Sequence, residues 1–236
     1  MREKGDQKFE RVFDRFTKSK QVHEAVLLVE NTKGDFSFSK GYGGKEIDSL
    51  FLMASITKLF TTACILILSE QKRLSLDDKI TQYFNNSILK GLHVYAGNEY
   101  TSELTIVDLL FQTSGLPDVY EEGKGSTKKR LIEEDFYFTL EEQIAGTKKL
   151  RPHFAPKRGA KAHYADINFD LLGEVLKTVC NSALSQIYKQ YIFDPLGLSD
   201  THLPESEHEF VPGIYFKDRL IYRPKFVISS GASGGC

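Results

Sequence analysis

The stretch Phe51-Leu52-Met53-Ala54-Ser55-Ile56-Thr57-Lys58 decides how this chain is interpreted, because it places a serine and a lysine at the start of an apolar helix. The segment 57–70 that follows is apolar almost all round, which is typical of a helix in the middle of a protein. Residues three apart on a helix share a face, so Ser55 and Lys58 are expected to be neighbours. The sequence therefore predicts a serine and an amine side by side at the mouth of a buried helix.

Helix electrostatics make a serine at this position suitable as a nucleophile. Its backbone N–H is one of the helix's unpaired donors and can help to hold an oxyanion. The positive end of the helix also favours developing negative charge. A partly desolvated lysine near that end is expected to have a lowered pKa, so that neutral Lys58 can take the Ser55 proton. The alternative is a capping serine with an exposed lysine, and these four residues alone favour that alternative.

A second motif, Tyr164-Ala165-Asp166, opens the apolar helix that the spacing predicts over 167–180. A tyrosine beside an amine can be pushed toward phenolate and relay a proton between a serine and a leaving group. Asp166 can hydrogen-bond Lys58 or a substrate, or it can cap the helix. Taken alone, this motif favours a tyrosine packed in a loop and a capping aspartate.

Six segments, in order along the chain, resemble the serine β-lactamase-like and penicillin-binding-protein superfamily, which includes class C β-lactamases, esterases and D-aminopeptidase-like serine hydrolases. The first is the Ser55 stretch, and the others are LSLDDKI at 74–80, LLFQTSGLP at 109–117, HYADINFDLLG at 163–173, FDPLGLSDT at 193–201 and ASGG at 232–235. Two positions depart from the family's usual pattern: Gln112 stands in place of histidine, and Asp166 in place of asparagine.

The resemblance implies that Ser55 is the acylated nucleophile, Lys58 its paired base and Tyr164 a second proton-relay residue. Asp166 would contact Lys58 and the substrate, and its charge should raise the lysine pKa relative to an amide neighbour. The implied enzyme is a serine hydrolase that works through a seryl-enzyme ester on a β-lactam, a small ester or a D-amino-acid peptide. Aspartate at the position of Asp166 also occurs in esterase-like members of the family, which slightly disfavours an enzyme that destroys penicillin.

Two alternatives from other functional classes stay open. One is a penicillin-binding or sensing module that is acylated but releases product too slowly to be an enzyme. The other is an inactive relative or fragment that is acylated slowly or not at all. Intact Ser55, Lys58 and Tyr164 disfavour the inactive relative.

The fold that the resemblance implies is α+β and β-lactamase/transpeptidase-like, with an antiparallel sheet flanked by helices and a helical subdomain. We expect a single domain over residues 1–236. Its parts would be an N-terminal helix, two strands and the start of the nucleophile helix in 1–60, a mainly helical region in 61–200, and a loop with a short hairpin in 201–236.

Local patterns predict individual elements. Apolar spacing indicates an amphipathic helix over 6–20, and β-rich composition indicates a strand at 25–29 buried on both faces, paired with a half-exposed strand at 36–39. Capping boxes are expected at Thr105 and Thr139. The remaining expectations are a helix over 183–192 ended by Pro195 and Gly197, loops over 117–138 and 198–213, a hairpin over 214–222, and a flexible tail over 229–236.

The family's third motif, Lys-Thr-Gly or His-x-Gly on a strand beside the site, is not found before Cys236. The C-terminal strands of the family sheet are not found either. The sequence therefore predicts a C-terminally truncated fragment or one half of a split protein, with the missing part of the same fold as a partner. Alone it is expected to be a poor catalyst, because losing one oxyanion donor costs roughly a hundred- to a thousandfold.

Charge and composition limit the kinds of partner that the chain is expected to bind. The 236 residues are 41% apolar and 27% charged, and 31 basic side chains nearly balance 32 acidic ones. Near neutrality gives no electrostatic reason to expect nucleic acid or an anionic membrane, so the expected partner is a small-molecule or peptide substrate. No apolar run is long enough to cross a bilayer, and no secretory signal is visible. The expected location is cytoplasmic as written, or extracytoplasmic if a leader was removed.

The cysteines point away from cross-links and metals. Cys64 and Cys180 lie in apolar helical runs, where buried free thiols are expected rather than a disulfide. No CxxC or Cys/His spacing suggests zinc. The serine-hydrolase resemblance likewise implies neither a metal nor an organic cofactor.

Overall fold

The computed structural model describes residues 2–123, 127–156 and 161–236. The chain divides into two compact units. The first comprises Met1–Phe51 with Pro212–Ile221, and the second comprises Leu52–Val211 with Tyr222–Cys236.

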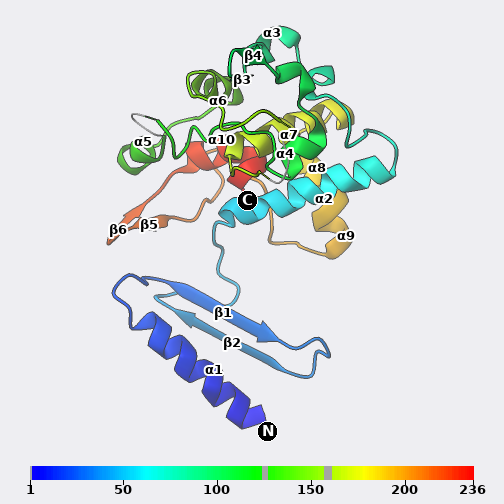
Figure 1. The fold of residues 1–236 in the computed structure, drawn as a ribbon. Helices are drawn as coiled ribbons and strands as arrows, with labels where there is room; N and C mark the ends of the chain where they lie inside the picture. Colours follow the sequence, from blue (N-terminus) through cyan, green and yellow to red (C-terminus); the bar gives the residue numbers. More distant parts are fainter. Residues whose placement is uncertain (1, 124–126, 157–160) are drawn as a thin grey trace. The chain divides into compact units, whose positions relative to one another are not determined.

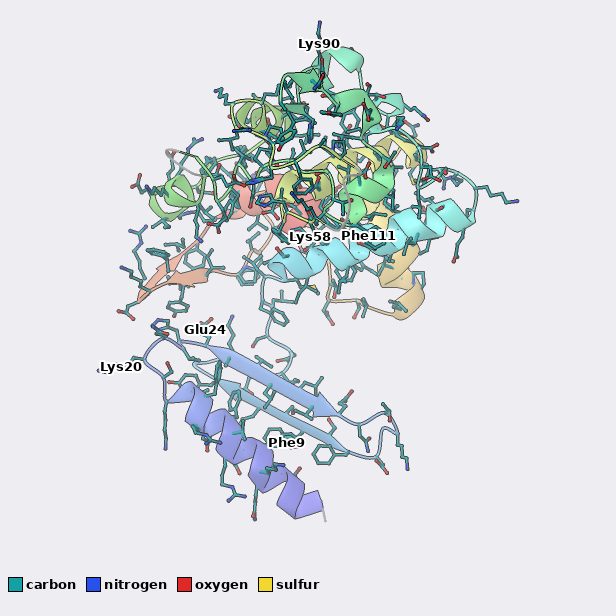
Figure 2. The ribbon with its side chains drawn as sticks, in the orientation of Figure 1. Phe9, Lys20, Glu24, Lys58, Lys90 and Phe111 are labelled. Carbon is teal, nitrogen blue, oxygen red and sulfur yellow. The ribbon has the colours of Figure 1, made fainter. Side chains whose placement is uncertain are left out.

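In the first unit, helix α1 (Arg2–Thr17) packs on an antiparallel hairpin of β1 (Ala25–Glu30) and β2 (Ser37–Tyr42). The Phe9 ring lies 5.8 Å from the rings of both Phe36 and Phe38 (Figure 2). Lys40 on β2 pairs with carboxylates of α1. The predicted N-terminal helix and the hairpin are confirmed.

The prediction that the first strand is buried on both faces is wrong. Leu28 in the middle of β1 is 52% exposed, because within this unit one helix packs against a sheet of only two strands. The unit also contains the predicted second hairpin, formed by β5 (Ile214–Phe216) and β6 (Arg219–Ile221). The ring of Tyr215 stacks on His23 at 4.2 Å.

Three helices lie side by side at the centre of the second unit: α2 (Thr57–Glu70), α7 (Asp166–Cys180) and α10 (Pro224–Gly234), drawn cyan, yellow and red (Figure 1). Close approach of α7 and α10 depends on Gly173, where an added Cβ would lie 2.6 Å from the Cβ of Ala232. The hydroxyl of Thr61 donates to the carbonyl of Ala232 at 2.8 Å. The start of α2 is thereby fixed against both partners.

Helix α2 has the bounds that its apolar composition predicts, but it is not covered all round. Cys64, Ile65 and Leu68 are fully buried, whereas Leu59 is 66% exposed. The packed helices cover part of the surface of α2 and leave the other part facing outward. The expectation of burial on every side is therefore wrong.

Shorter elements surround this centre. They are η1 (Ala54–Ile56), η2 (Ile80–Gln82), α3 (Asn86–Leu89), β3 (Val94–Tyr95), β4 (Asn98–Glu99), η3 (Thr101–Glu103), α4 (Ile106–Leu110), α5 (Thr127–Glu133), α6 (Leu140–Thr147), α8 (Leu184–Tyr188), the π-helical turn η4 (Lys189–Phe193) and α9 (Asp194–Leu196). Capping boxes begin α4 at Thr105 and α6 at Thr139, as predicted.

Three local predictions are corrected. Helix α5 lies inside the segment expected to be loop, 117–138. The helix predicted over 183–192 extends through η4 into α9, and Pro195 does not stop it because proline is tolerated in the first turn of a helix. It ends at Gly197, with φ 67°, as predicted. The tail expected to be flexible forms most of α10, which buries Val227 and Ala232 against the unit's core.

The composition of elements is α+β, as predicted. In the described parts of the chain the strands form three separate two-stranded antiparallel sheets, β1–β2, β3–β4 and β5–β6. Among these same residues, no helix has both the length and the apolar character needed to cross a membrane.

Candidate active site

Lys58 lies in the first turn of α2 (Figure 2), and its amine contacts three oxygen atoms. Its Nζ donates to Ser55 Oγ at 3.1 Å, to Asp166 Oδ1 at 2.7 Å and to the carbonyl oxygen of Ser233 at 2.6 Å. An ammonium has three N–H donors, and all three are used here. The lysine is buried rather than exposed, so the capping alternative raised by the sequence does not describe this side chain.

The Ser55 hydroxyl belongs to the turn η1, which leads directly into α2. The preceding residue, Ala54, has φ 47°, a left-handed conformation that is uncommon outside glycine. Ser55 Oγ lies 2.7 Å from Tyr164 Oη, and either oxygen can donate. Residues 109 positions apart in sequence are thus joined by one hydrogen bond.

Asp166 decides the charge state of the lysine. Burial of Lys58 lowers its pKa, but the charge of Asp166 and its hydrogen bond outweigh burial, and the net pKa is raised above 10.5. The expectation of a lowered lysine pKa is therefore wrong, whereas the expectation that an acid at position 166 acts in the raising direction agrees with this result. At neutral pH Lys58 is an ammonium paired with Asp166.

Gln112 holds the segment that carries Tyr164. Its side-chain oxygen accepts from the N–H of Ala165 at 3.0 Å and from the side-chain amide of Asn168, and its carbonyl accepts from the N–H of His163 at 2.9 Å. The backbone at Gln112 has φ 57°, which turns the chain toward α7. From the sequence, Gln112 was only a departure from the family pattern. Its role in holding the Tyr164 segment was not predicted.

A pocket of about 160 Å³ opens beside Ser55. Three carboxyl groups line it, those of Asp118, Asp166 and Asp170, and none of its described lining residues is basic. Burial, reinforced by the charge of Asp166, raises the pKa of Asp118 to about 6 and that of Asp170 to about 8. Nothing in the sequence pointed to Asp118 or Asp170, since neither belongs to a motif that marks an acid.

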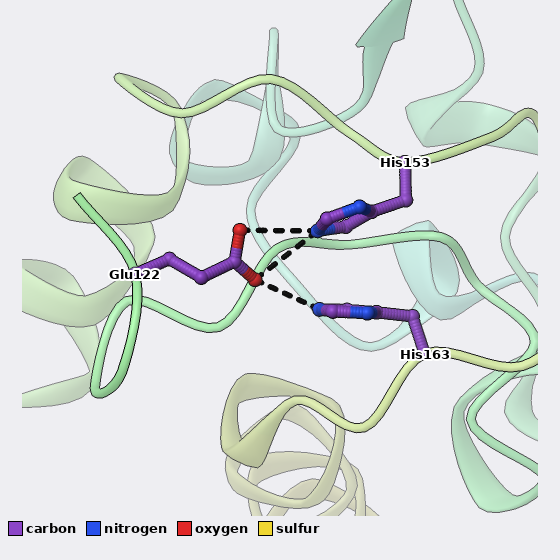
Figure 3. A group of neighbouring side chains, drawn as sticks. All are labelled: Glu122, His153 and His163. Atoms are coloured by element: carbon purple, nitrogen blue, oxygen red, sulfur yellow. Dashed lines mark hydrogen bonds and ion pairs between the residues drawn. The ribbon is translucent and has the colours of Figure 1, made fainter.

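A separate cluster contains the side chains Glu122, His153 and His163 (Figure 3). His153 Nε2 lies 3.0 Å from Glu122 Oε2, and His163 Nε2 lies 2.8 Å from Glu122 Oε1. Burial raises the pKa of Glu122, but the N–H of Asp118 and the two imidazoles outweigh it, and the net pKa is lowered. Imidazole and carboxylate are metal-binding groups, and His163 is the residue before Tyr164.

All four residues singled out from the sequence, Ser55, Lys58, Tyr164 and Asp166, therefore meet at the start of α2. Their catalytic and binding roles stay predictions. The arrangement can move a proton from a serine hydroxyl to a phenol or an amine while a carboxylate holds that amine.

The Beta-lactamase family model matches residues 9–213. The chain belongs to that family, whose members are hydrolases of the serine β-lactamase superfamily, and it has the β-lactamase/transpeptidase-like fold. The family resemblance and the fold class inferred from the sequence are confirmed.

Particular relatives place the chain more closely. It is 26% identical over 194 residues to "Protein flp" of Staphylococcus aureus, covering 78% of this chain and 35% of that protein. It is 31% identical over 159 residues to the D-alanyl-D-alanine-carboxypeptidase/endopeptidase AmpH of Escherichia coli, covering 66% of this chain and 37% of that protein. The chain therefore spans little more than a third of the length of these relatives.

Among solved structures, the octameric penicillin-binding protein homologue from Pyrococcus abyssi superposes with a TM-score of 0.74 and 24% identity. The superposition covers 97% of this chain and 52% of that one. At this identity the similarity establishes the fold alone.

Proposed function

We propose that this chain carries out acyl transfer through an ester on Ser55. The Ser55 oxygen attacks a carbonyl carbon while its proton passes to Tyr164 or Lys58, and the leaving group departs with a proton returned by the same relay. Water then cleaves the ester and regenerates the hydroxyl. The observation that carries this proposal is the placement of Ser55 Oγ within 2.7 Å of Tyr164 Oη and 3.1 Å of Lys58 Nζ.

Lys58 is suited to the relay because its surroundings fit both of its charge states. As an ammonium it donates to Ser55, Asp166 and the carbonyl of Ser233. As a neutral amine it keeps two N–H donors for Asp166 and the carbonyl of Ser233, and it turns its lone pair toward the hydroxyl of Ser55. Asp166 supports the ammonium and so stabilises the lysine after it has taken the proton.

The substrates we propose are those expected from the sequence: a β-lactam, a small ester or a D-amino-acid peptide. The pocket beside Ser55 favours a D-amino-acid peptide that carries a free amine. Asp118, Asp166 and Asp170 line this pocket, and none of its described lining residues is basic. An ammonium would be attracted to the carboxylate of Asp118, because a nearby opposite charge favours the charged form of a carboxyl group. The name of the AmpH relative, a D-alanyl-D-alanine carboxypeptidase/endopeptidase, points to the same class of peptide.

One observation favours a second candidate, a penicillin-binding or sensing module. The pKa of Lys58 is raised, so little neutral amine is present at neutral pH to activate water against the ester. Such a protein would acylate and then hold the adduct.

The deciding experiment uses the full chain, a fluorescent penicillin and D-alanine p-nitroanilide, with Ser55→Ala as the test and Ser102→Ala, an exposed serine elsewhere in the fold, as the matched control. Mass spectrometry of peptide fragments should find the penicilloyl adduct at residue 55 in the wild type and in the control, and not in Ser55→Ala. Release of p-nitroaniline over many turnovers supports the hydrolase, and a persistent adduct supports the sensing module. Absence of any adduct, or an adduct that survives in Ser55→Ala, would contradict both.

A further inference from the structure

Away from Ser55 and its partners, three side chains of the kinds that bind metal ions lie close together, although they come from separate parts of the chain. Glu122 lies in the segment between α4 and α5, whereas His153 and His163 lie in the connection between α6 and α7. One possible donor atom from each of the three lies within 4.8 Å of the others. Figure 3 shows both imidazoles directing a nitrogen at the same carboxylate.

The distances match those of a zinc coordination sphere. Zinc binds imidazole nitrogen at about 2.0–2.1 Å and carboxylate oxygen at about 2.0–2.2 Å, in a tetrahedron whose edges are therefore roughly 3.3 Å long. The observed separations between imidazole nitrogen and carboxylate oxygen are 2.8 to 3.1 Å. The rings of His153 and His163 are stacked with their centroids 3.6 Å apart, so binding of an ion would require the two imidazoles to turn toward a common point.

The backbone already holds the ligands in place. The N–H of His153 donates to the carbonyl of Gly115, and the N–H of His163 donates to the carbonyl of Gln112. The carboxylate of Glu122 accepts from the N–H of Asp118 at 2.8 Å. All three ligands are therefore attached to one short stretch, residues 112–118, so that little order has to be imposed when an ion binds.

The ion would be accessible and incompletely enclosed. The side chains of Glu122, His153 and His163 are 31%, 38% and 29% exposed. Two imidazoles and one carboxylate form a three-ligand set that leaves a fourth tetrahedral position for water. Imidazole-rich sets of this kind prefer zinc to the harder ions magnesium and calcium.

We propose that Glu122, His153 and His163 form a zinc-binding site that ties the segment carrying Tyr164 to the segment 112–122. His163 precedes Tyr164 directly, so an ion bound there fixes the start of the Tyr164-Ala165-Asp166 motif. The bound ion replaces the direct hydrogen bonds between the imidazoles and the carboxylate. Zinc here has a positioning role and takes no part in the acyl transfer.

The test is zinc binding to the full chain after dialysis against a chelator, measured by isothermal titration calorimetry and by the visible absorption of bound Co²⁺. The wild type should bind one ion per chain. His153→Asn and His163→Asn should each bind at least about tenfold more weakly, since loss even of an outer-shell partner costs 10–100-fold. Glu122→Gln, which keeps the size of the side chain and removes its charge, should also weaken binding. His208→Asn, at an exposed histidine outside the cluster, should bind as the wild type does.

Circular dichroism in chelator separates loss of ligand from loss of fold, because only variants with the wild-type spectrum are compared. Absence of one-to-one binding in the wild type, or equal affinity in the folded wild type, His163→Asn and Glu122→Gln proteins, would overturn the proposal. Neither readout depends on whether Ser55 is acylated.

Discussion

At the scale of single residues, Lys58 is held by three hydrogen bonds to separate oxygen atoms. Its buried amine donates to one side-chain hydroxyl, one carboxylate and one carbonyl. Removing a partner of a buried charge leaves that charge uncompensated, which costs several kcal/mol. The carboxylate of Asp166 is therefore the group that sets when Lys58 can give up its proton.

This dependence gives a prediction for the pH dependence of acylation. Asp166→Asn keeps an oxygen acceptor but removes the negative charge, so the raised pKa of Lys58 should fall. If neutral Lys58 is the base, the pH midpoint of acylation should move downward. The rate at neutral pH should then rise by roughly ten- to a thousandfold, because an adjacent opposite charge moves a pKa by about 1–3. The measurement is the rate of adduct formation from about pH 6 to pH 11.

Asp200→Asn, at an exposed aspartate outside the site, is the matched control and should keep the wild-type midpoint. A midpoint that is unchanged in Asp166→Asn would show that Lys58 is not the titrating base.

The role of Gln112, which departs from the family pattern, is visible only in the tertiary structure. From the sequence it was only a glutamine where histidine is usual. In the structure its side-chain and backbone oxygens hold the segment that begins with His163 and continues into α7. Its role follows from contacts with residues more than fifty positions away, which no local pattern contains.

At the scale of elements, the packing of α7 against α10 decides where the carbonyl of Ser233 meets Lys58. Glycine at position 173 is what permits the approach, since a Cβ there would overlap the Cβ of Ala232. Alanine normally favours a helix over glycine by about 1 kcal/mol. Packing and intrinsic propensity therefore act in opposite directions at this position.

We expect packing to prevail. Gly173→Ala should lower the free energy of unfolding by about 1–3 kcal/mol, the usual cost of overpacking. The double variant Gly173→Ala with Ala232→Gly should recover much of that loss, because it restores the space between the two helices. Urea unfolding of the four proteins in the cycle measures the coupling. Strict additivity of the two single substitutions would contradict a direct contact between these positions.

At the scale of the whole molecule, the buried carboxyl groups of the second unit link stability to pH. The pKa of Asp170 in the folded protein, about 8, lies above its ordinary value of 3.8, so the folded state binds this proton more tightly than the unfolded state. The resulting stabilisation is fully present below about pH 4 and is lost as the pH rises through about 8.

Asp170→Asn should remove this pH dependence while keeping an acceptor for the N–H of Ser233. We therefore expect the stability of the wild type, relative to the variant, to decline between about pH 4 and pH 8. Urea unfolding at a series of pH values measures the difference, with the exposed Asp77→Asn as control. A difference that does not change with pH would show that Asp170 titrates at the same pH in the folded and unfolded states.

The proposed domain organisation also belongs to this scale. The structure describes two compact units separately, so a single domain over residues 1–236 stays a prediction. The same holds for the partners and activity of the whole protein, because the chain covers 35–37% of the length of the curated relatives named above.

The sequence by itself determined the family, the elements with strong local signals and the identity of Ser55 and the three residues around it. It could do so because helix period, capping boxes and motif order are properties of neighbouring residues. Helix α10 was missed because its run of serine and glycine has weak helix propensity, and only packing against α2 and α7 makes it a helix.

Only the tertiary structure decided the chemistry of the site. The charge on Lys58 depends on Asp166, 108 residues away, and the acidic pocket depends on residues from five separate segments. The Glu122, His153 and His163 cluster likewise has no characteristic spacing, so a zinc site could not be expected from the sequence. Electrostatic energies depend on distance in space and on burial, and neither quantity is encoded by separation along the chain.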